Sequence, residues 1–289
     1  MSAGRLACRF VAVAVLAVVF STTGQGASGR SRQLPFDLQD GADIVVPVMV
    51  DGRGPFRFLL DTGSSRTVLS STLAESLGVV PIARTVLLTP SGRAGHPIGV
   101  VRRVEVGAAP PTNVLAMIVP DANLPQGRRV DGIVGQDVLA ALTYTIDYVN
   151  RHIVWHVAPP PNLVGERLRL LRSDRGVLVT LPQPTTGDLH FVPDSGADGW
   201  VLFGATGQQL LVTRPLGSAS LRTVAGEHAA RGVLIDELIV GAMRFRDQPA
   251  VLVDRDPHDR SLGDGLLPLH LFARVTFNPR EQQLIVEGK

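Results

Sequence analysis

Cysteine is almost absent from this sequence. The 289 residues include one cysteine, Cys8, which lies just before an apolar N-terminal run. Without residues 1–27, the remaining 262 residues contain no cysteine, which excludes disulfide bonds. The fold must therefore be stabilised by burial, and 45% hydrophobic residues supply enough apolar material for one or two cores.

Lysine is equally scarce, because Lys289 is the only one and every other basic residue is an arginine. Residues 1–27 carry two arginines and no acidic residue, so the rest of the chain has 26 basic and 26 acidic residues. It also contains no basic tract. This balance argues against nucleic acid or an anionic membrane as a partner.

Long apolar runs are also missing. The run Phe10–Phe20 has 11 residues, which is short for a membrane-spanning helix. Two arginines precede it and small and polar residues follow it, which is the order of a secretory signal peptide. We therefore expect a signal peptide at residues 1–27, a leader segment at 28–41, and a periplasmic or extracellular protein. An N-terminal membrane anchor that is not cleaved is the alternative.

Helical periodicity is rare beyond the N-terminal segment. Short β-branched runs, separated by clusters of Gly, Pro, Asn and Asp, predict an all-β fold with short connections. One helix is expected at residues 70–78, between a serine start and a glycine stop. The sequence Ala-Pro-Pro-Pro-Asn at 158–162 predicts a stiff linker between two β-rich lobes, at 42–157 and 163–289.

An acidic residue at the end of an apolar run occurs twice. Asp61 begins the sequence Asp-Thr-Gly-Ser-Ser, and Asp194 begins Asp-Ser-Gly-Ala-Asp. Glycines lie seven residues before, 38 after and 71 after each aspartate; the pairs are Gly54 and Gly187, Gly99 and Gly232, and Gly132 and Gly265. Three matching offsets are not expected by chance, so we interpret the chain as a duplicated half-unit.

The pattern at residues 59–65, with Gly-Ile-Val-Gly at 132–135, resembles the retropepsin-like and pepsin-like aspartic proteases. It is most similar to bacterial exported single-chain members with two retropepsin-sized halves, over residues 42 to 288. The resemblance implies an acid protease fold, with two related β-barrel-like lobes, few short helices and an active-site cleft between the lobes. It also implies a monomer that hydrolyses peptide or protein substrates without a cofactor or a metal.

The resemblance further implies roles for individual residues. Asp61 and Asp194 would be the catalytic pair, because two close carboxyl groups share one proton and can act as base and acid toward a water. Ser64 would donate a hydrogen bond to Asp61. The other supporting residues it implies are Thr62, Gly63, Ser195 and Gly196 in the aspartate loops, Gly132, Gly135 and Gly265 in the segments that brace those loops, and Ser91, Gly92 and Gly226 in hairpins over the cleft.

The second half departs from the pattern in four places. These are Pro193 before Asp194, Ala197 in place of Ser64, Asp198 in place of Ser65, and Pro268 in place of Gly135. Ala197 would leave Asp194 without an outer hydrogen bond, whereas Asp198 is expected to face solvent. Two alternatives therefore stay open: a catalytically degenerate peptide-binding protein of the same architecture, and a homodimer that pairs Asp61 from two chains.

Three other polar or aromatic features are given structural interpretations. Asp137, whose counterpart is His270, is expected to be a surface or helix-capping acid. Trp200 could line the cleft or be buried in the core, and the sequence leaves both open. His152 and His156 flank a strand without a third ligand nearby, so we expect no metal site there.

Overall fold

The computed structural model describes residues 33–39, 42–89, 92–124, 130–158, 160, 162–173, 176–204, 212–254 and 263–289. The predicted signal peptide at 1–27 lies outside the described residues, as do Ser91, Pro159 and Pro161. Part of the predicted leader segment forms two short strands, β1 (Gln33–Pro35) and β2 (Asp37–Gln39). None of the helices in the described ranges has the length and apolar character needed to cross a membrane.

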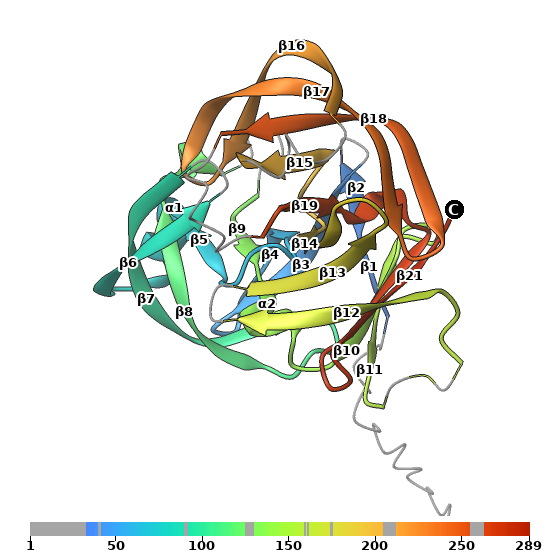
Figure 1. The fold of residues 1–289 in the computed structure, drawn as a ribbon. Coiled ribbons are helices and arrows are strands. Elements are labelled where there is room, and N and C mark those ends of the chain that lie inside the picture. The colour runs from blue at the N-terminus through green and yellow to red at the C-terminus, as the bar shows by residue number, and fades with distance from the viewer. Residues whose placement is uncertain are drawn as a thin grey trace, which may run out of the picture. The chain divides into compact units, whose positions relative to one another are not determined.

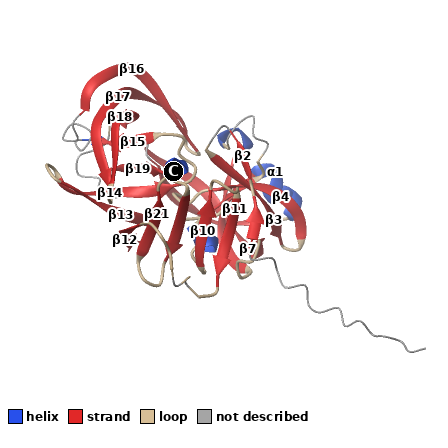
Figure 2. Ribbon diagram, turned by 90° about the vertical axis from the view of Figure 1, so that its right-hand side faces the viewer, coloured by secondary structure: helices blue, strands red, loops and turns tan. Residues whose placement is uncertain are grey.

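Strands make up most of the described chain, as Figure 2 shows, and this confirms the all-β prediction. The helical elements in the described residues are α1 (Ser71–Leu77), α2 (Gln136–Leu139), η1 (Asp121–Asn123) and η2 (Leu269–Leu271). Helix α1 lies where the sequence predicts it. The Ser70 hydroxyl accepts the Leu73 N–H at 3.0 Å, and Gly78 ends the helix at φ 71°, a conformation that favours glycine.

The first lobe is an eight-stranded sheet in the order β2-β3-β4-β9-β5-β8-β7-β6. Its remaining strands are β3 (Asp43–Val50), β4 (Arg53–Leu60), β5 (Val68–Ser70), β6 (Pro81–Thr89), β7 (Gly92–Val106), β8 (Thr112–Val119) and β9 (Gly132–Val134). An additional antiparallel pairing of β3 with β7 closes the sheet on itself (Figure 1). The closure satisfies backbone groups that an open edge would leave unpaired.

The second lobe repeats this strand order. Its strands are β13 (Gly176–Gln183), β14 (Gly187–Asp194), β15 (Trp200–Phe203), β16 (Val212–Thr223), β17 (Gly226–Val240), β18 (Met243–Val253) and β19 (Gly265–Pro268). They are ordered β13-β14-β19-β15-β18-β17-β16, which matches β3-β4-β9-β5-β8-β7-β6 of the first lobe strand for strand. The two lobes therefore place their aspartate strands, β4 and β14, in the same topological position.

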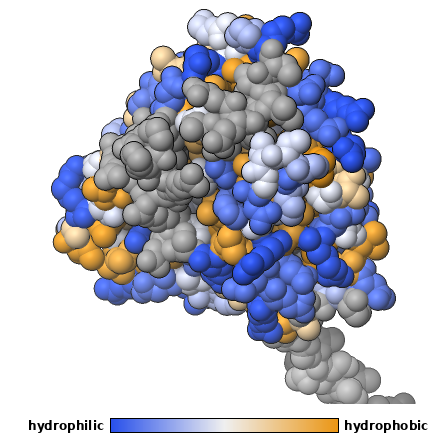
Figure 3. Space-filling model, viewed as in Figure 1, coloured by the Kyte–Doolittle hydropathy of each residue, from blue (hydrophilic) through white to orange (hydrophobic). Residues whose placement is uncertain are grey.

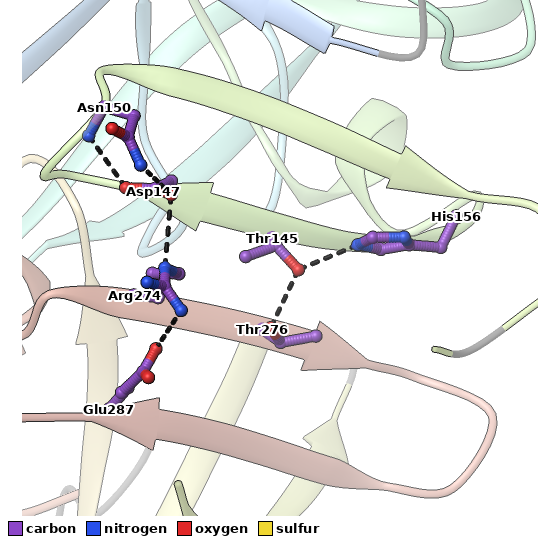
Figure 4. Close-up of polar contacts among 7 residues, drawn as sticks. All are labelled: Thr145, Asp147, Asn150, His156, Arg274, Thr276 and Glu287. Carbon is purple, nitrogen blue, oxygen red and sulfur yellow. Dashed lines mark hydrogen bonds and ion pairs between the residues drawn. The ribbon is translucent and has the colours of Figure 1, made fainter. Parts of the chain in front are cut away.

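Six strands from both halves of the chain, here called the central sheet, have the order β1-β11-β10-β20-β21-β12. Through the pairing of β12 with β13 they continue into the strands of the second lobe as one 13-stranded sheet. The strands not yet placed are β10 (Thr143–Asp147), β11 (His152–His156), β12 (Glu166–Ser173), β20 (Arg274–Asn278) and β21 (Gln283–Glu287). β10 and β20 pair antiparallel in the middle of the central sheet. Polar contacts also cross this pair, as Figure 4 shows: the Thr145 and Thr276 hydroxyl oxygens lie 2.8 Å apart, and Arg274 contacts Asp147 at 3.2 Å.

Alternation along the strands produces three buried apolar clusters. The largest is the main core, which includes Phe58, Leu60, Phe191 and Leu267. The opposite strand faces form two smaller clusters, here called the first wall and the second wall. The first wall is Leu59, Val68, Met117, Val119, Leu124 and Ile133, and the second wall is Val192, Ala197, Val201, Phe203, Val253 and Leu266. On the face drawn in Figure 3, apolar residues are scattered in separate patches between hydrophilic ones.

Candidate active site

The two sequence-predicted aspartates lie at equivalent ends of equivalent strands. Asp61 directly follows β4, and Asp194 is the last residue of β14. Each strand pairs in parallel with a short strand that begins at a glycine, β4 with β9 and β14 with β19. The parallel pairing with β9 or β19 sets where each aspartate strand ends, and therefore sets the position of the aspartate.

The bracing glycines are required because backbone passes directly over them. A Cβ on Gly132 would lie 2.3 Å from the Val68 carbonyl oxygen, and one on Gly265 would lie 2.2 Å from the Val201 carbonyl oxygen. Gly135 is equally confined, since its Cβ would lie 2.7 Å from the Arg66 oxygen. These positions exclude a side chain, which explains the glycines that the sequence places there.

The two aspartate loops are joined by four reciprocal hydrogen bonds. The Thr62 hydroxyl donates to the Pro193 carbonyl at 2.8 Å and accepts the Ser195 N–H at 3.0 Å. The Ser195 hydroxyl donates to the Leu60 carbonyl at 2.8 Å and accepts the Thr62 N–H at 3.0 Å. Both side chains are 1% exposed, so water does not compete for these bonds. Pro193 participates through its carbonyl, and its missing N–H therefore does not weaken the arrangement.

Each aspartate is held by main-chain N–H groups of its own loop. Asp61 Oδ1 accepts from Gly63 at 2.8 Å and from Ser64 at 3.0 Å. Asp194 accepts from Gly196 at 2.7 Å and from the Ala197 N–H. The two carboxyl groups also form a hydrogen bond with each other. The structure thus brings together the pair that the sequence identifies.

Ser64 donates to Asp61 as expected, but through its main chain, whereas the expected loss of a hydrogen bond at Ala197 is wrong. The Ser64 hydroxyl donates to the Arg66 carbonyl at 2.8 Å, and it is the Ser64 main-chain N–H that reaches Asp61. Ala197 does not deprive Asp194 of an outer hydrogen bond, because the main-chain N–H at this position supplies it. The serine-to-alanine difference between the loops therefore does not change how the carboxyl groups are held.

Burial and mutual proximity raise the pKa of both carboxyl groups. The pKa of Asp61 is raised by burial, against the lowering effect of hydrogen bonds from Ser64, Gly63 and Asp194. The pKa of Asp194 is raised well above its usual value by burial and then by the charge of Asp61. Because both pKa values are raised and the two carboxyl groups interact, the pair holds one proton between them.

The glycines beside the aspartates leave room for the opposite carboxyl group. A Cβ on Gly63 would lie 2.7 Å from Asp194 Cγ and 2.8 Å from its Oδ2. A Cβ on Gly196 would lie 3.3 Å from Asp194 Oδ1 and 3.4 Å from Asp61 Cγ. Both distances from Gly63 lie well inside van der Waals contact and those from Gly196 do not, so the loops approach each other more closely at Gly63.

Residues behind the first loop support it in ways that the sequence did not indicate. The Gln136 side-chain amide donates to the Thr62 carbonyl at 2.9 Å and to Tyr144 Oη at 3.3 Å. Asp137 accepts from the Thr67 N–H at 2.9 Å and from its hydroxyl at 2.8 Å. The expectation of a surface or capping role for Asp137 is therefore wrong, because its half-buried carboxylate ties α2 to the first loop.

The second loop is supported by different residues at the same positions. His270, the counterpart of Asp137, forms a hydrogen bond with the Ala197 main chain, and burial lowers the pKa of its ring. Pro268 takes the place of Gly135 and pairs with Asp194 in the parallel register of β14 and β19. Asp198 is exposed, as expected.

One sequence alternative away from the loops is also resolved by burial and contacts. Trp200 is 2% exposed and packs edge-on against Phe191 and Phe245, so it belongs to the core and does not line a cleft. His156 lies 2.8 Å from the Thr145 hydroxyl in the central sheet. Among the described residues, no group of three His, Cys, Asp or Glu side chains could hold a metal ion.

Each lobe carries a long hairpin, β6–β7 in the first and β16–β17 in the second (Figure 1). Gly92 begins β7, whereas Ser91 lies outside the described residues. Gly226 begins β17 at φ 116°, a conformation that glycine adopts readily. The turn of the second hairpin reaches the other lobe, because the Val224 carbonyl accepts from Asn123 Nδ2 at 2.9 Å and the Val224 side chain packs on the first wall.

Comparison with known proteins gives one family and one similar solved structure. Residues 46–138, which contain Asp61 and the strands around it, match the aspartyl protease family. None of the curated proteins matches the chain. Among solved structures, the chain is similar to basic 7S globulin from soybean, at 12% identity and a TM-score of 0.48, over 88% of this chain and 93% of that one. The family match thus covers most of the first lobe, and the second lobe repeats the strand order of that lobe.

Proposed function

We propose that this protein is an exported aspartic endopeptidase that hydrolyses peptide bonds with Asp61 and Asp194. The observation that carries the proposal is the pair itself. Two aspartates from equivalent loops of one chain form a hydrogen bond with each other, in a frame fixed by Thr62 and Ser195. A half-buried carboxyl pair of this kind is costly to a fold, and such groups concentrate where chemistry uses them.

Within this proposal, we give the two carboxyl groups their roles from the larger rise in pKa at Asp194. Ionised Asp61 takes a proton from a water molecule placed between the carboxyl groups, and that water attacks the scissile carbonyl carbon. Protonated Asp194 donates to the carbonyl oxygen as it becomes negatively charged. In the second step Asp61 returns the proton to the leaving nitrogen, and the shared proton goes back to Asp194. Every proton transfer uses groups of this chain and one water.

The second loop favours catalysis over a purely binding role. A degenerate second half would be expected to lose contacts to Asp194, yet the hydrogen bonds from Gly196 and Ala197 are present despite the substitutions. A homodimer is not needed to pair Asp61 with a second aspartate, because Asp194 of the same chain lies opposite it. We therefore propose a monomer in which peptide or protein substrates contact both lobes.

The proposal extends to the history and location of the chain. The matching strand order of the two lobes supports an origin by internal duplication. The order of charges and apolar residues in 1–27 supports export to the periplasm or beyond the cell. Mass spectrometry of the N-terminus of the protein from its source would test the cleavage of this segment.

The catalytic proposal is tested with the chain from residue 28 onward, incubated with a diverse peptide pool from about pH 3 to pH 7. Asp61→Asn and Asp194→Asn should each lower cleavage by at least about 10³-fold. Asp198→Asn is the matched control, because it makes the same chemical change at an exposed position four residues from Asp194, and it should retain activity.

Each other outcome has a definite meaning. If only Asp61→Asn loses activity, catalysis belongs to Asp61 alone, and the mass of the protein in solution would have to be that of a dimer. If the parent cleaves no peptide at any pH and no pepstatin-type ligand binds, the enzyme proposal fails and the chain is a binding protein.

A further inference from the structure

Two histidines occupy the inward faces of the two hairpins. His96 lies on β7 and shares a strand face with Ile98, which packs on the first wall. His228 lies on β17 two residues before Ala230 and pairs across the hairpin with Leu221, and both of these neighbours pack on the second wall. Because side chains alternate along a strand, both imidazoles point toward the walls.

The two walls begin beside the catalytic pair. Leu59 and Val192 lie two residues before Asp61 and Asp194, and Ala197 of the second aspartate loop is itself part of the second wall. The turn at Val224 reaches the first wall from the second lobe. A peptide bound at the aspartates would therefore lay its side chains against these apolar walls, beneath the hairpins.

The histidines are the polar exception in these apolar surroundings. Nε2 of His96 and Nε2 of His228 are both buried and have no hydrogen-bond partner. His96 is only 6% exposed as a residue. A buried nitrogen without a partner is unfavourable in the free protein, and a ligand that supplies the missing partner recovers that cost on binding.

The charges nearby favour an anionic ligand group. The Arg84 guanidinium lies close enough to His96 to help burial lower the pKa of the imidazole, and it donates to the Gly95 carbonyl at 2.8 Å. Glu227 precedes His228 but is exposed and already contacts Ser220 and Arg222, so it does not neutralise the imidazole. Neither ring thus has a carboxylate partner from its own hairpin.

We infer that His96 and His228 are specificity-determining residues that each hydrogen-bond an acidic side chain of the bound peptide, so that the preferred substrates combine apolar residues with Asp or Glu. This inference rests on the proposed function only in taking a peptide as the ligand. A neutral imidazole with its proton on Nε2 donates from that atom to a carboxylate oxygen, and the positive charge of Arg84 near His96 favours such an anion. The walls receive the neighbouring apolar side chains of the same peptide.

The test measures binding separately from cleavage. The chain carrying Asp61→Asn is titrated at about pH 7, where the glutamates of the peptides are ionised. The probes are fluorescent peptides in which one position of an otherwise apolar sequence is Glu or Gln. The Glu peptide at the responsive position should bind on the order of tenfold more tightly than its Gln partner.

Variants then assign the preference to the histidines. His96→Leu and His228→Leu, each added to Asp61→Asn, should reduce the Glu-over-Gln ratio to within about twofold at the peptide position that the replaced ring contacts. His96→Gln and His228→Gln keep a donor near Nε2 and should retain part of the ratio. His152→Leu changes a half-buried histidine of the central sheet and should leave the ratio unchanged. Circular dichroism and thermal unfolding check that each variant folds.

The outcomes separate this inference from the proposed function. Equal affinity for Glu and Gln peptides at every position, or a ratio that survives both leucine variants, overturns the inference even if the parent cleaves peptides. A ratio that depends on the histidines supports it even if the parent cleaves nothing, in which case the endopeptidase proposal fails and selective peptide binding remains.

Discussion

The two aspartate loops are alike where they face each other and different where each meets its own lobe. At the meeting point, Thr62 and Ser195 exchange equivalent hydrogen bonds with the opposite strand ends. Behind it, Gln136 and Asp137 brace the first loop, whereas Leu269 and His270 occupy those positions in the second. The hydrogen bonds are thus equivalent in both loops where the two carboxyl groups are held together. Behind the loops, each lobe packs different side chains.

The largest expected effect comes from removing one hydroxyl at the meeting point. Thr62→Val and Ser195→Ala should each destabilise the fold by about 2–4 kcal/mol, because each change leaves a buried N–H and a buried carbonyl without a partner. Denaturant unfolding measures both. Similar losses of unfolding free energy for the two variants would support the equivalence of the two loops, because the four hydrogen bonds have matching geometry.

The double variant and a control complete that measurement. Once either hydroxyl is lost the loops are free to separate, so the double variant should cost less than the sum of the two single changes. Thr112→Val, whose hydroxyl donates only to the Pro110 carbonyl near the surface, should cost less than about 0.5 kcal/mol. A large difference between Thr62→Val and Ser195→Ala would break the equivalence of the loops.

The next prediction tests the closer approach of the two loops at Gly63 than at Gly196. Gly63→Ala places a Cβ 2.7 Å from Asp194 Cγ, and that carboxyl cannot withdraw without losing its bonds to Gly196 and Ala197. We expect a loss of about 1–3 kcal/mol of stability and a roughly 100-fold lower kcat. Gly196→Ala, at 3.3 Å and beyond, should stay within about tenfold of the parent.

Gly199→Ala is the control for these substitutions, because nothing lies within 4 Å of its Cβ. It should leave kcat and unfolding unchanged. If Gly63→Ala and Gly196→Ala behave alike, the closer approach at Gly63 has no consequence and the loops are functionally symmetric.

A smaller effect concerns the unequal pKa shifts of the two carboxyl groups. A raised pKa in the folded state stabilises the protein below the unfolded pKa of about 3.9, and this contribution is lost as the pH rises through the folded value. Asp194→Asn removes the group with the larger shift, so this variant should unfold at a higher temperature than the parent at pH 7. Each kcal/mol gained in the free energy of unfolding raises Tm by roughly 2–4 °C.

The pH dependence of that difference is the decisive measurement. The Tm advantage of Asp194→Asn should shrink as the pH falls toward about 4, where the parent carboxyl is protonated at little cost. Asp61→Asn should show a smaller advantage, because the pKa of Asp61 is raised less. A larger gain from Asp61→Asn would reverse the assignment of the proton to Asp194.

The sequence predicted what is encoded by short, repeated patterns. The two aspartates, the hydroxyl residues beside them and the confined glycines each follow from a local motif, and the structure brings them together. It did not predict Asp137 with Thr67 or Asn123 with Val224, because these partners are 70 and 101 residues apart and meet only through the fold. Nor can residue type alone tell whether a serine acts through its hydroxyl or its main chain.

The smallest predicted effect concerns Ser64, whose hydroxyl and main-chain N–H donate to different acceptors. The serine differs from Ala197 of the second loop only by a hydroxyl that donates to the Arg66 carbonyl, while the bond to Asp61 comes from the main chain. Ser64→Ala should therefore leave kcat within about twofold and cost no more than about 1 kcal/mol, the net value of one partly exposed hydrogen bond. The pH profile of cleavage should not move, since the pKa of Asp61 responds to the main-chain N–H. The reciprocal variant Ala197→Ser should be equally silent in its pH profile. If Ser64→Ala instead shifts the acidic limb of that profile, the hydroxyl reaches Asp61 during catalysis, and the two loops hold their carboxyl groups differently after all.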